Sequence, residues 1–223
     1  MTVKLFCQAI VKFLLGAVIV GALLFIPTGG FGYVNGWLLM GVLFVPMFIA
    51  GIVMMVKDPE LLKKRLNAKE RQPEQWTVVA LSAVMFVLGF AGAGLSFRFG
   101  WLMLPGYVSW AGAAVFLLAY LMYAEVLREN TYLSRTVEVQ EGQRVIDTGL
   151  YGIVRHPMYT ATVILFLAMP LVLGSAISFV IFLIYPVIIA KRIGNEEKVL
   201  EAGLKGYAEY KKRIKYRLIP FIW

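Results

Sequence analysis

The stretch "MYTATVILFLAMPLVLGSAISFVIFLIYPVIIA" at residues 158–190 decides how this chain can fold. It is apolar throughout, yet it is much longer than the about 20 residues that cross a bilayer core as one helix. Pro170, Gly174 and Pro186 lie inside it, and a proline interrupts the hydrogen bonds of a helix. The stretch therefore predicts either a helical hairpin that turns near "MPLVLGSA" at 169–176 or one long, tilted and broken helix.

The composition of the whole chain indicates an integral membrane protein. Hydrophobic residues make up 60% and aromatic residues 14%, which is more than soluble domains carry. The single cysteine, Cys7, excludes an internal disulfide, and with one histidine the chain cannot assemble a Cys/His metal site by itself. The net charge of +9 is explained better by basic loops on one side of a membrane than by nucleic-acid binding. We therefore expect neither a metal nor a nucleic-acid partner.

Four further apolar stretches are long enough to span a membrane, at residues 5–26, 34–56, 77–97 and 102–126. The first is longer than the apolar core of a signal peptide, and no A-x-A cleavage site follows it, so we expect a span there. The sequence thus predicts an all-α integral membrane protein with four transmembrane helices plus a C-terminal broken helix or helical hairpin. It divides into a transmembrane region, residues 1–127, and a C-terminal region, residues 128–223, that is expected to hold the functional site.

The distribution of charge favours the hairpin over the single tilted helix. If the chain turns back within 158–190, every Lys and Arg except Arg98 lies on the same side of the membrane. A single crossing would move all the basic residues after residue 190 to the other side. Because basic residues collect in cytoplasmic loops, the hairpin predicts that both termini and the functional site are cytoplasmic.

Two segments outside the spans have the pattern of amphipathic or capped helices. In "KDPELLKKRL" at 57–66, Asp58 is placed to cap a helix that begins at Pro59. The segment "EEKVLEAGLKGYAEYKKRIKYRL" at 196–218 predicts one amphipathic helix with an apolar stripe, formed by Leu200, Leu204, Tyr207, Tyr210 and Ile214. Such a stripe suits either a helix lying on anionic lipid or a lid over a site.

The glycine-rich "GFAGAG" at 89–94 is not expected to bind a nucleotide. A dinucleotide loop follows a β-strand, and this segment lies within a predicted membrane span. Small residues at such a place allow neighbouring helices to approach closely, so we predict close helix packing there.

The polar segment 128–157, "RENTYLSRTVEVQEGQRVIDTGLYGIVRHP", is the longest without membrane-spanning character. "TVEV" and "RVI" predict short extended strands. Gly149 and Gly152 are expected at tight turns with positive φ. A backbone of this kind beside a membrane can present N–H and C=O groups to a small ligand. The simpler alternative is a cytoplasmic linker.

The only histidine lies at the boundary between this polar segment and the apolar stretch. Pro157 is suited to the first turn of a helix, with His156 near its cap. Arg155, His156 and the helix N-terminus would then form a positive corner that suits a carboxylate or phosphate. A lone histidine at a membrane boundary is, by itself, more often an interfacial residue. The hairpin changes that balance, because it brings this corner close to Arg192 and Glu196 at its other end.

These residues together resemble a known family. "TGLYGIVRHPMY" at 148–159, an apolar hairpin, "RIGNEEKVL" at 192–200 and "YAEYKKRIKYRLIPFIW" at 207–223 resemble the C-terminal half of the isoprenylcysteine carboxyl methyltransferase family and the related membrane phospholipid methyltransferases. The resemblance covers about residues 128–223, whereas residues 1–127 match only as membrane spans. It implies a catalytic region that binds S-adenosylmethionine at the cytoplasmic face.

The resemblance also implies roles for individual residues. Arg192 matches a position that faces the methyl acceptor, and we treat it as the catalytic residue. Glu196 is suited to the cofactor's ammonium group, and Tyr151 with Val145 and Ile146 to its adenine. Glu197 would be the base if the acceptor were an amine. The complete set of expected cofactor contacts is Gln140, Gln143, Val145, Ile146, Tyr151, Arg155, His156, Pro157, Met158, Tyr159, Glu196 and Glu197.

The acceptor is less defined than the cofactor. A site at the membrane implies a lipophilic small molecule, a prenylated substrate or a membrane lipid, and the family name favours an isoprenylcysteine carboxylate over a phospholipid or amine. An NADPH-dependent sterol-type reductase is the alternative enzyme, because those membrane proteins have a similar tyrosine-rich helix and proline–aromatic tail. A small transporter is the non-enzyme alternative, but spans two to four carry almost no polar residues to line a path. The sequence does not indicate an oligomeric state.

Overall fold

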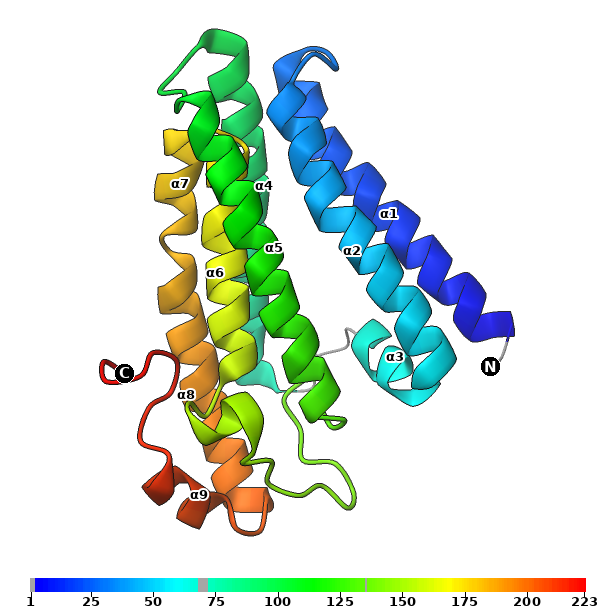
Figure 1. Ribbon diagram of the computed structural model, residues 1–223, viewed down its shortest axis with the longest axis vertical. Helices are drawn as coiled ribbons and strands as arrows, with labels where there is room; N and C mark the ends of the chain where they lie inside the picture. Colours follow the sequence, from blue (N-terminus) through cyan, green and yellow to red (C-terminus); the bar gives the residue numbers. More distant parts are fainter. Residues whose placement is uncertain (1–2, 68–71, 135) are drawn as a thin grey trace.

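The computed structural model describes residues 3–67, 72–134 and 136–223. The long helices α1 (Val3–Thr28), α2 (Val34–Lys57), α4 (Pro73–Phe99) and α5 (Gly106–Glu129) correspond to the four predicted spans (Figure 1). Five segments are long and apolar enough to cross a membrane, and the fifth is Ala176–Gly203 in the C-terminal region. The structure therefore confirms an all-helical integral membrane protein.

The stretch 158–190 forms the hairpin. Helix α6 (Pro157–Val172) ends close after Pro170, and the chain reverses at Gly174, which has φ +66°. Helices α7 (Ala176–Phe182) and α8 (Tyr185–Gly203) then run back beside α6 (Figure 1). The alternative of one tilted helix is therefore wrong. The returning arm, Ala176–Gly203, is long enough to span a membrane, whereas Pro157–Val172 is a shorter apolar helix.

The closed end of the hairpin is held by polar contacts with the residue before α2, with α4 and with the loop between α4 and α5. Tyr33 donates from its hydroxyl to the main-chain oxygen of Leu173, and Ser175 contacts Ser96 at 3.0 Å between hydroxyls. The main-chain N–H of Leu104 donates to the oxygen of Gly174 at 2.8 Å. The bonds to Leu173 and Gly174 give hydrogen-bond partners to backbone groups that a turn leaves unpaired. Such partners are needed most where no water can replace them.

The glycine-rich segment 89–94 does pack closely against other helices. A Cβ placed on Gly94 would lie 2.6 Å from the main-chain oxygen of Leu24 in α1, and a Cβ on Gly89 would clash with the ring of Phe182 in α7. The prediction of close helix packing is confirmed.

The predicted cap of the short helix is also confirmed. Helix α3 (Pro59–Leu66) begins at Pro59, and Asp58 accepts the main-chain N–H of Leu61 at 2.9 Å through Oδ1.

The predicted single C-terminal helix is wrong. Helix α8 ends at Gly203, Gly206 has φ +87°, and α9 (Tyr207–Arg213) starts in a new direction. Glycine permits this break, because it adopts positive φ without steric cost. The apolar stripe survives the break: Leu204, Tyr207 and Tyr210 are buried in one cluster, with Leu200 and Ile214 packed against it.

The predicted strands at "TVEV" and "RVI" are wrong as well, since the described residues of this segment form no strand. Among the described residues, no neighbouring segment supplies a ladder of hydrogen bonds. Side chains replace it locally, as where Gln143 accepts the main-chain N–H of Gln140 at 2.8 Å.

The two ends of the bundle differ in charge. One end carries the turns between α1 and α2, between α4 and α5, and between α6 and α7, and Arg98 is its basic residue (Figure 1). The opposite end carries α3, the polar segment, α9 and both termini, together with the other Lys and Arg residues that the structure describes. Lys69, Arg71 and Arg135, which the charge argument included, lie outside the described residues.

Candidate functional site

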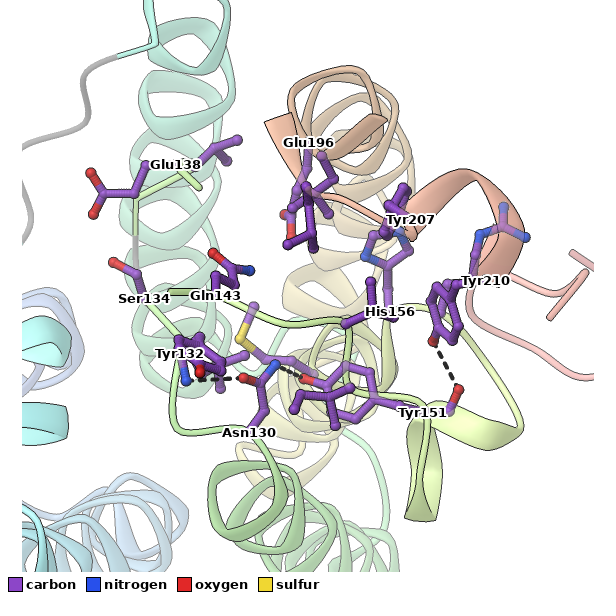
Figure 2. A pocket seen from close by; sticks show the side chains of 18 of the residues that line it. Asn130, Tyr132, Ser134, Glu138, Gln143, Tyr151, His156, Glu196, Tyr207 and Tyr210 are labelled. Atoms are coloured by element: carbon purple, nitrogen blue, oxygen red, sulfur yellow. Dashed lines mark hydrogen bonds between the residues drawn. The ribbon is translucent and has the colours of Figure 1, made fainter. Parts of the chain in front are cut away.

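A cleft lies at the open end of the hairpin. Its empty space, including the part that opens to solvent, is about 830 Å³. Its walls come from the polar segment after α5, from the start of α6 and from the end of α8 with α9 (Figure 2). The predicted site residues that line it are Gln143, Val145, Ile146, Tyr151, Arg155, His156, Met158, Tyr159, Arg192 and Glu196.

The two ends of the hairpin meet below this cleft through Glu197. Its side chain is 2% exposed, and Oε1 accepts from Arg155 Nε at 2.7 Å and lies 3.2 Å from His156 Nε2. Oε2 accepts from Arg217 Nη2 at 3.0 Å. Two guanidinium groups and one imidazole thus contact one buried carboxylate, and Lys211 Nζ lies 3.6 Å from its Oε2. Glu197 does not line the cleft but lies behind the residues that do.

The guanidinium of Arg155 donates its hydrogen bonds to other groups of the protein. Besides Glu197, its Nη1 donates to the main-chain oxygens of Ile214 and Lys215 at 2.7 and 2.8 Å. Its own main-chain N–H donates to Tyr216 at 2.9 Å. Arg155 therefore ties the segment after α9 to the start of α6. His156 stands at the N-cap of α6 without a side-chain capping bond, and Pro157 is buried in its first turn.

A second set of polar contacts lies on the cleft wall itself. Tyr159 donates from its hydroxyl to Glu196 Oε2 and accepts from Arg192 Nε at 2.9 Å. The guanidinium of Arg192 also lies 6.0 Å from the centre of the Tyr159 ring. A carboxylate and a guanidinium therefore face the same cleft, joined through one phenol.

The remaining wall is aromatic and apolar. Tyr151 accepts at its hydroxyl from Asn130 Nδ2 at 2.9 Å, and Tyr210 donates to the main-chain oxygen of Tyr151 at 2.8 Å (Figure 2). Burial raises the pKa of both phenols, so both stay protonated at neutral pH. Val145 and Ile146 complete a surface suited to a flat, apolar ring.

Tyr207 is a cleft residue to which the sequence assigned no role in the site. It is 3% exposed, and its hydroxyl has no hydrogen-bond partner in the described part of the chain. Burial raises its pKa, so the hydroxyl remains a donor. Because buried polar atoms are nearly always paired, this hydroxyl is a candidate contact for a ligand atom. The apolar stripe could have predicted Tyr207 as a site residue, because four of its members line the cleft: Leu200, Leu204, Tyr207 and Tyr210.

The polar segment after α5 contributes more residues to the cleft than the sequence predicted. Asn130, Tyr132 and Ser134 line the cleft before Gln143, whereas Gln140 does not. Gln140 instead bonds within the polar segment, where its side chain donates to the main-chain oxygen of Tyr132 at 2.5 Å. The only feature of the sequence that pointed to these residues was the large number of hydrogen-bond donors and acceptors in the polar segment.

The two glycines of the next turn behave differently from each other. Gly149 has the expected positive φ, +53°, at the start of the 3₁₀-helix η1 (Gly149–Gly152). Gly152, at its end, does not adopt positive φ, because it continues the turns of η1.

The N-terminal region also contacts this site. Gln75 in α4 is fully buried, and its Nε2 donates to the main-chain oxygen of Arg192 at 3.4 Å. Asn195 Nδ2 donates to the main-chain oxygen of Glu74 at the same distance. These bonds hold the start of α4 against the part of α8 that carries the candidate catalytic residue.

Part of the chain is similar to a known protein family. Residues 110–202 match the family model described as the isoprenylcysteine carboxyl methyltransferase (ICMT) family, so the predicted resemblance is confirmed over these residues. They run from α5 to α8 and include most of the cleft.

A second similarity points to another enzyme class. The chain is 29% identical over 91 residues to a Delta(14)-sterol reductase of Mus musculus. The matched part is 40% of this chain and 22% of the reductase, so the chain spans only a minor part of that protein's length.

Proposed function

We propose that this membrane protein, whose residues 110–202 match the isoprenylcysteine carboxyl methyltransferase family, moves a methyl group from S-adenosylmethionine to a lipophilic carboxylate of the isoprenylcysteine type. The observation that carries the proposal is the pairing of Glu196 and Arg192 through Tyr159 on one wall of the cleft. A carboxylate and a guanidinium side by side suit a zwitterionic cofactor and an anionic acceptor, respectively.

The cleft offers partners for each part of the cofactor. Glu196 is suited to its ammonium group, because a charged hydrogen bond is about twice as strong as a neutral one. Tyr151, Val145 and Ile146 form a surface for the adenine ring, and the hydroxyl of Tyr207 can donate to a nucleoside atom. When bound, the cofactor supplies an electrophilic methyl group on a sulfonium. The protein then has to align the acceptor with it and keep water out.

Arg192 is suited to orient the acceptor. A guanidinium binds a carboxylate with two parallel hydrogen bonds, which fixes both its position and its direction. A carboxylate is already a nucleophile and needs no base. Glu197, the base expected for an amine acceptor, already accepts from Arg155, His156 and Arg217 and is shielded from the cleft. This geometry favours a carboxylate over an amine.

The distribution of basic residues supports a cytoplasmic site. The end that carries the cleft holds the described Lys and Arg residues other than Arg98, and basic residues collect on the cytoplasmic side. We place both termini there with the cleft.

The test begins with cofactor binding to the purified protein. S-adenosylhomocysteine should raise the midpoint of thermal unfolding, whereas NADPH should leave it unchanged. Stabilisation by NADPH alone would instead support a reductase, the alternative that the 29% identity to a sterol reductase favours.

A second assay tests transfer and identifies the acceptor. Membranes that contain the protein are supplied with S-adenosylmethionine carrying a tritiated methyl group, and the label is then followed into lipid extracts. Release of the label by mild base indicates a methyl ester. A base-stable label would indicate an amine product and would contradict the carboxylate acceptor.

A further inference from the structure

The segment after α9 closes into an apolar hook, which we define as residues 218–223. The main-chain N–H groups of Leu218 and Ile219 donate to the main-chain oxygen of Trp223 at 2.9 and 3.1 Å. Phe221, at the tip, has φ +66°, a conformation that residues other than glycine rarely adopt. The hook is therefore a defined turn held by its own hydrogen bonds.

The base of the hook is attached firmly to the mouth of the hairpin. Leu218 is 5% exposed, and its main-chain oxygen accepts from Thr160 Oγ1 at 2.8 Å. Arg217, directly before the hook, bonds to Glu197 and lies 5.2 Å from the centre of the Trp223 ring. The hook is thus built onto the same buried ion network that joins the two ends of the hairpin.

The tip of the hook, in contrast, projects from the protein. Phe221 is 87% exposed, Ile222 77% and Ile219 49%. A contiguous apolar projection is unfavourable in water, and on a rigid base it indicates a surface that meets something apolar.

The position of the hook in the fold indicates that it lies at the membrane surface. It returns from α9 along α8 to the level of α3, which lies on the opposite side of the bundle (Figure 1). Helices α4 and α5 also have their polar ends near this level, at Pro73 and Glu129. The level therefore marks one surface of the membrane.

The charge around the hook agrees with that surface. Lys215 and Arg217 lie directly before it in the chain, and α9 ends in three more basic residues, of which Lys211 and Arg213 form ion pairs with Glu201 and Asp147. Apolar and aromatic side chains beside a basic cluster are typical of segments that bind anionic lipid at the bilayer interface.

We propose that the hook inserts Ile219, Phe221 and Ile222 into the anionic lipid interface of the membrane that the helices span. The membrane-facing element at this end is then the hook, and not the stripe of α8 and α9, which faces the cleft. Because the hook shares the Glu197 network, its insertion holds the mouth of the cleft at the membrane surface. This inference does not depend on methyl transfer.

The test measures the depth of single labelled positions in lipid vesicles. Cys7→Ser removes the single cysteine, and Phe221→Cys or Ile222→Cys then carries a nitroxide in vesicles of phosphatidylcholine and phosphatidylglycerol. We expect both labels to collide more with oxygen than with a water-soluble nickel chelate. A label at the exposed Lys212→Cys on α9 is the matched control and should show the reverse. Chelate accessibility at 221 and 222 equal to that at 212 would overturn the proposal.

A second measurement separates lipid from another copy of the chain. The spectrum of the label at 221 should not change with the ratio of protein to lipid. Spin–spin broadening that grows with this ratio would show that a second copy covers the tip, and it would also overturn the proposal. Since both tip side chains are exposed, these substitutions should leave the midpoint of thermal unfolding unchanged.

Discussion

Glu196 and Glu197 are neighbours on α8, yet they serve two different regions of the molecule. Glu196 faces the cleft and bonds to Tyr159. Glu197 turns away into a buried network with Arg155, His156 and Arg217. Adjacent residues on a helix point in directions about 100° apart, so one pair of identical side chains can divide ligand chemistry from structural support. The comparison predicts that the two members of this acidic pair have separate roles, which substitutions can distinguish.

The largest effect is expected from Glu197→Ala. Removing one member of a buried ion pair leaves the other charges uncompensated, which typically costs about 3–5 kcal/mol of unfolding free energy. The variant should unfold at a markedly lower temperature, measured in detergent, and should also lose cofactor binding. Glu197→Gln, which keeps the shape, should still be strongly destabilised. Unchanged stability in both variants would show that the network does not hold the hairpin mouth.

Substitution of Glu196 should reduce ligand binding without this loss of stability. Glu196→Gln removes the charge that faces the cofactor's ammonium, and a hydrogen bond to a charged group contributes about 1.5–3 kcal/mol. Affinity for S-adenosylhomocysteine, measured by calorimetry, should fall by about tenfold to a hundredfold. A loss of stability as large as that of Glu197→Gln would show that the two glutamates are not divided in this way.

Arg192→Ala should affect turnover more than cofactor affinity. An oriented donor at the reacting group typically contributes about 10²–10³-fold to turnover. Turnover should fall by that order in the methyl-transfer assay, while affinity for S-adenosylhomocysteine changes little. Arg192→Lys keeps the charge but not the two-pronged geometry, so it should remain impaired. Equal losses of affinity and turnover in Arg192→Ala would move this residue from the acceptor to the cofactor.

The smallest effect is expected from Tyr207→Phe. The free protein should be as stable as the parent or slightly more stable, because the buried hydroxyl has no described partner to lose. Cofactor affinity should fall by roughly threefold to tenfold, the usual value of one neutral hydrogen bond. Tyr210→Phe is the contrasting control, since its hydroxyl bonds to Tyr151 and its loss should lower stability. Undiminished cofactor affinity in Tyr207→Phe would show that the hydroxyl does not bind the cofactor.

Much of the fold was predictable because its signals are local. Long apolar stretches predicted the spans, and Pro170 with Gly174 predicted the turn of the hairpin. The cap at Asp58 followed from three adjacent residues. The break at Gly203 and Gly206 was missed, because a regular apolar stripe continued across it. The predicted strands failed, because alternation along a chain does not supply a partner to pair with.

The candidate site was predictable in its members more than in their arrangement. Ten of the thirteen residues expected from the sequence line the cleft, while Gln140, Pro157 and Glu197 do not. The contribution of Tyr207 was missed, and so was the contact of Gln75 with Arg192, since the two residues are 117 positions apart in the chain.

By itself, the sequence determined that the chain lies in a membrane, where it turns back, and which two motifs meet at the mouth of that turn. Those properties depend on hydrophobicity, proline and charge along short stretches. Only the tertiary structure decided which glutamate faces the cleft, that the C-terminal stripe lines it, and that the tip of the hook projects from the protein. These outcomes depend on the rotation of each helix and on partners far away in the chain, such as Arg217 for Glu197 and Tyr159 for Glu196. A local sequence pattern does not predict the rotation of a helix, because the rotation results from how all the helices pack together.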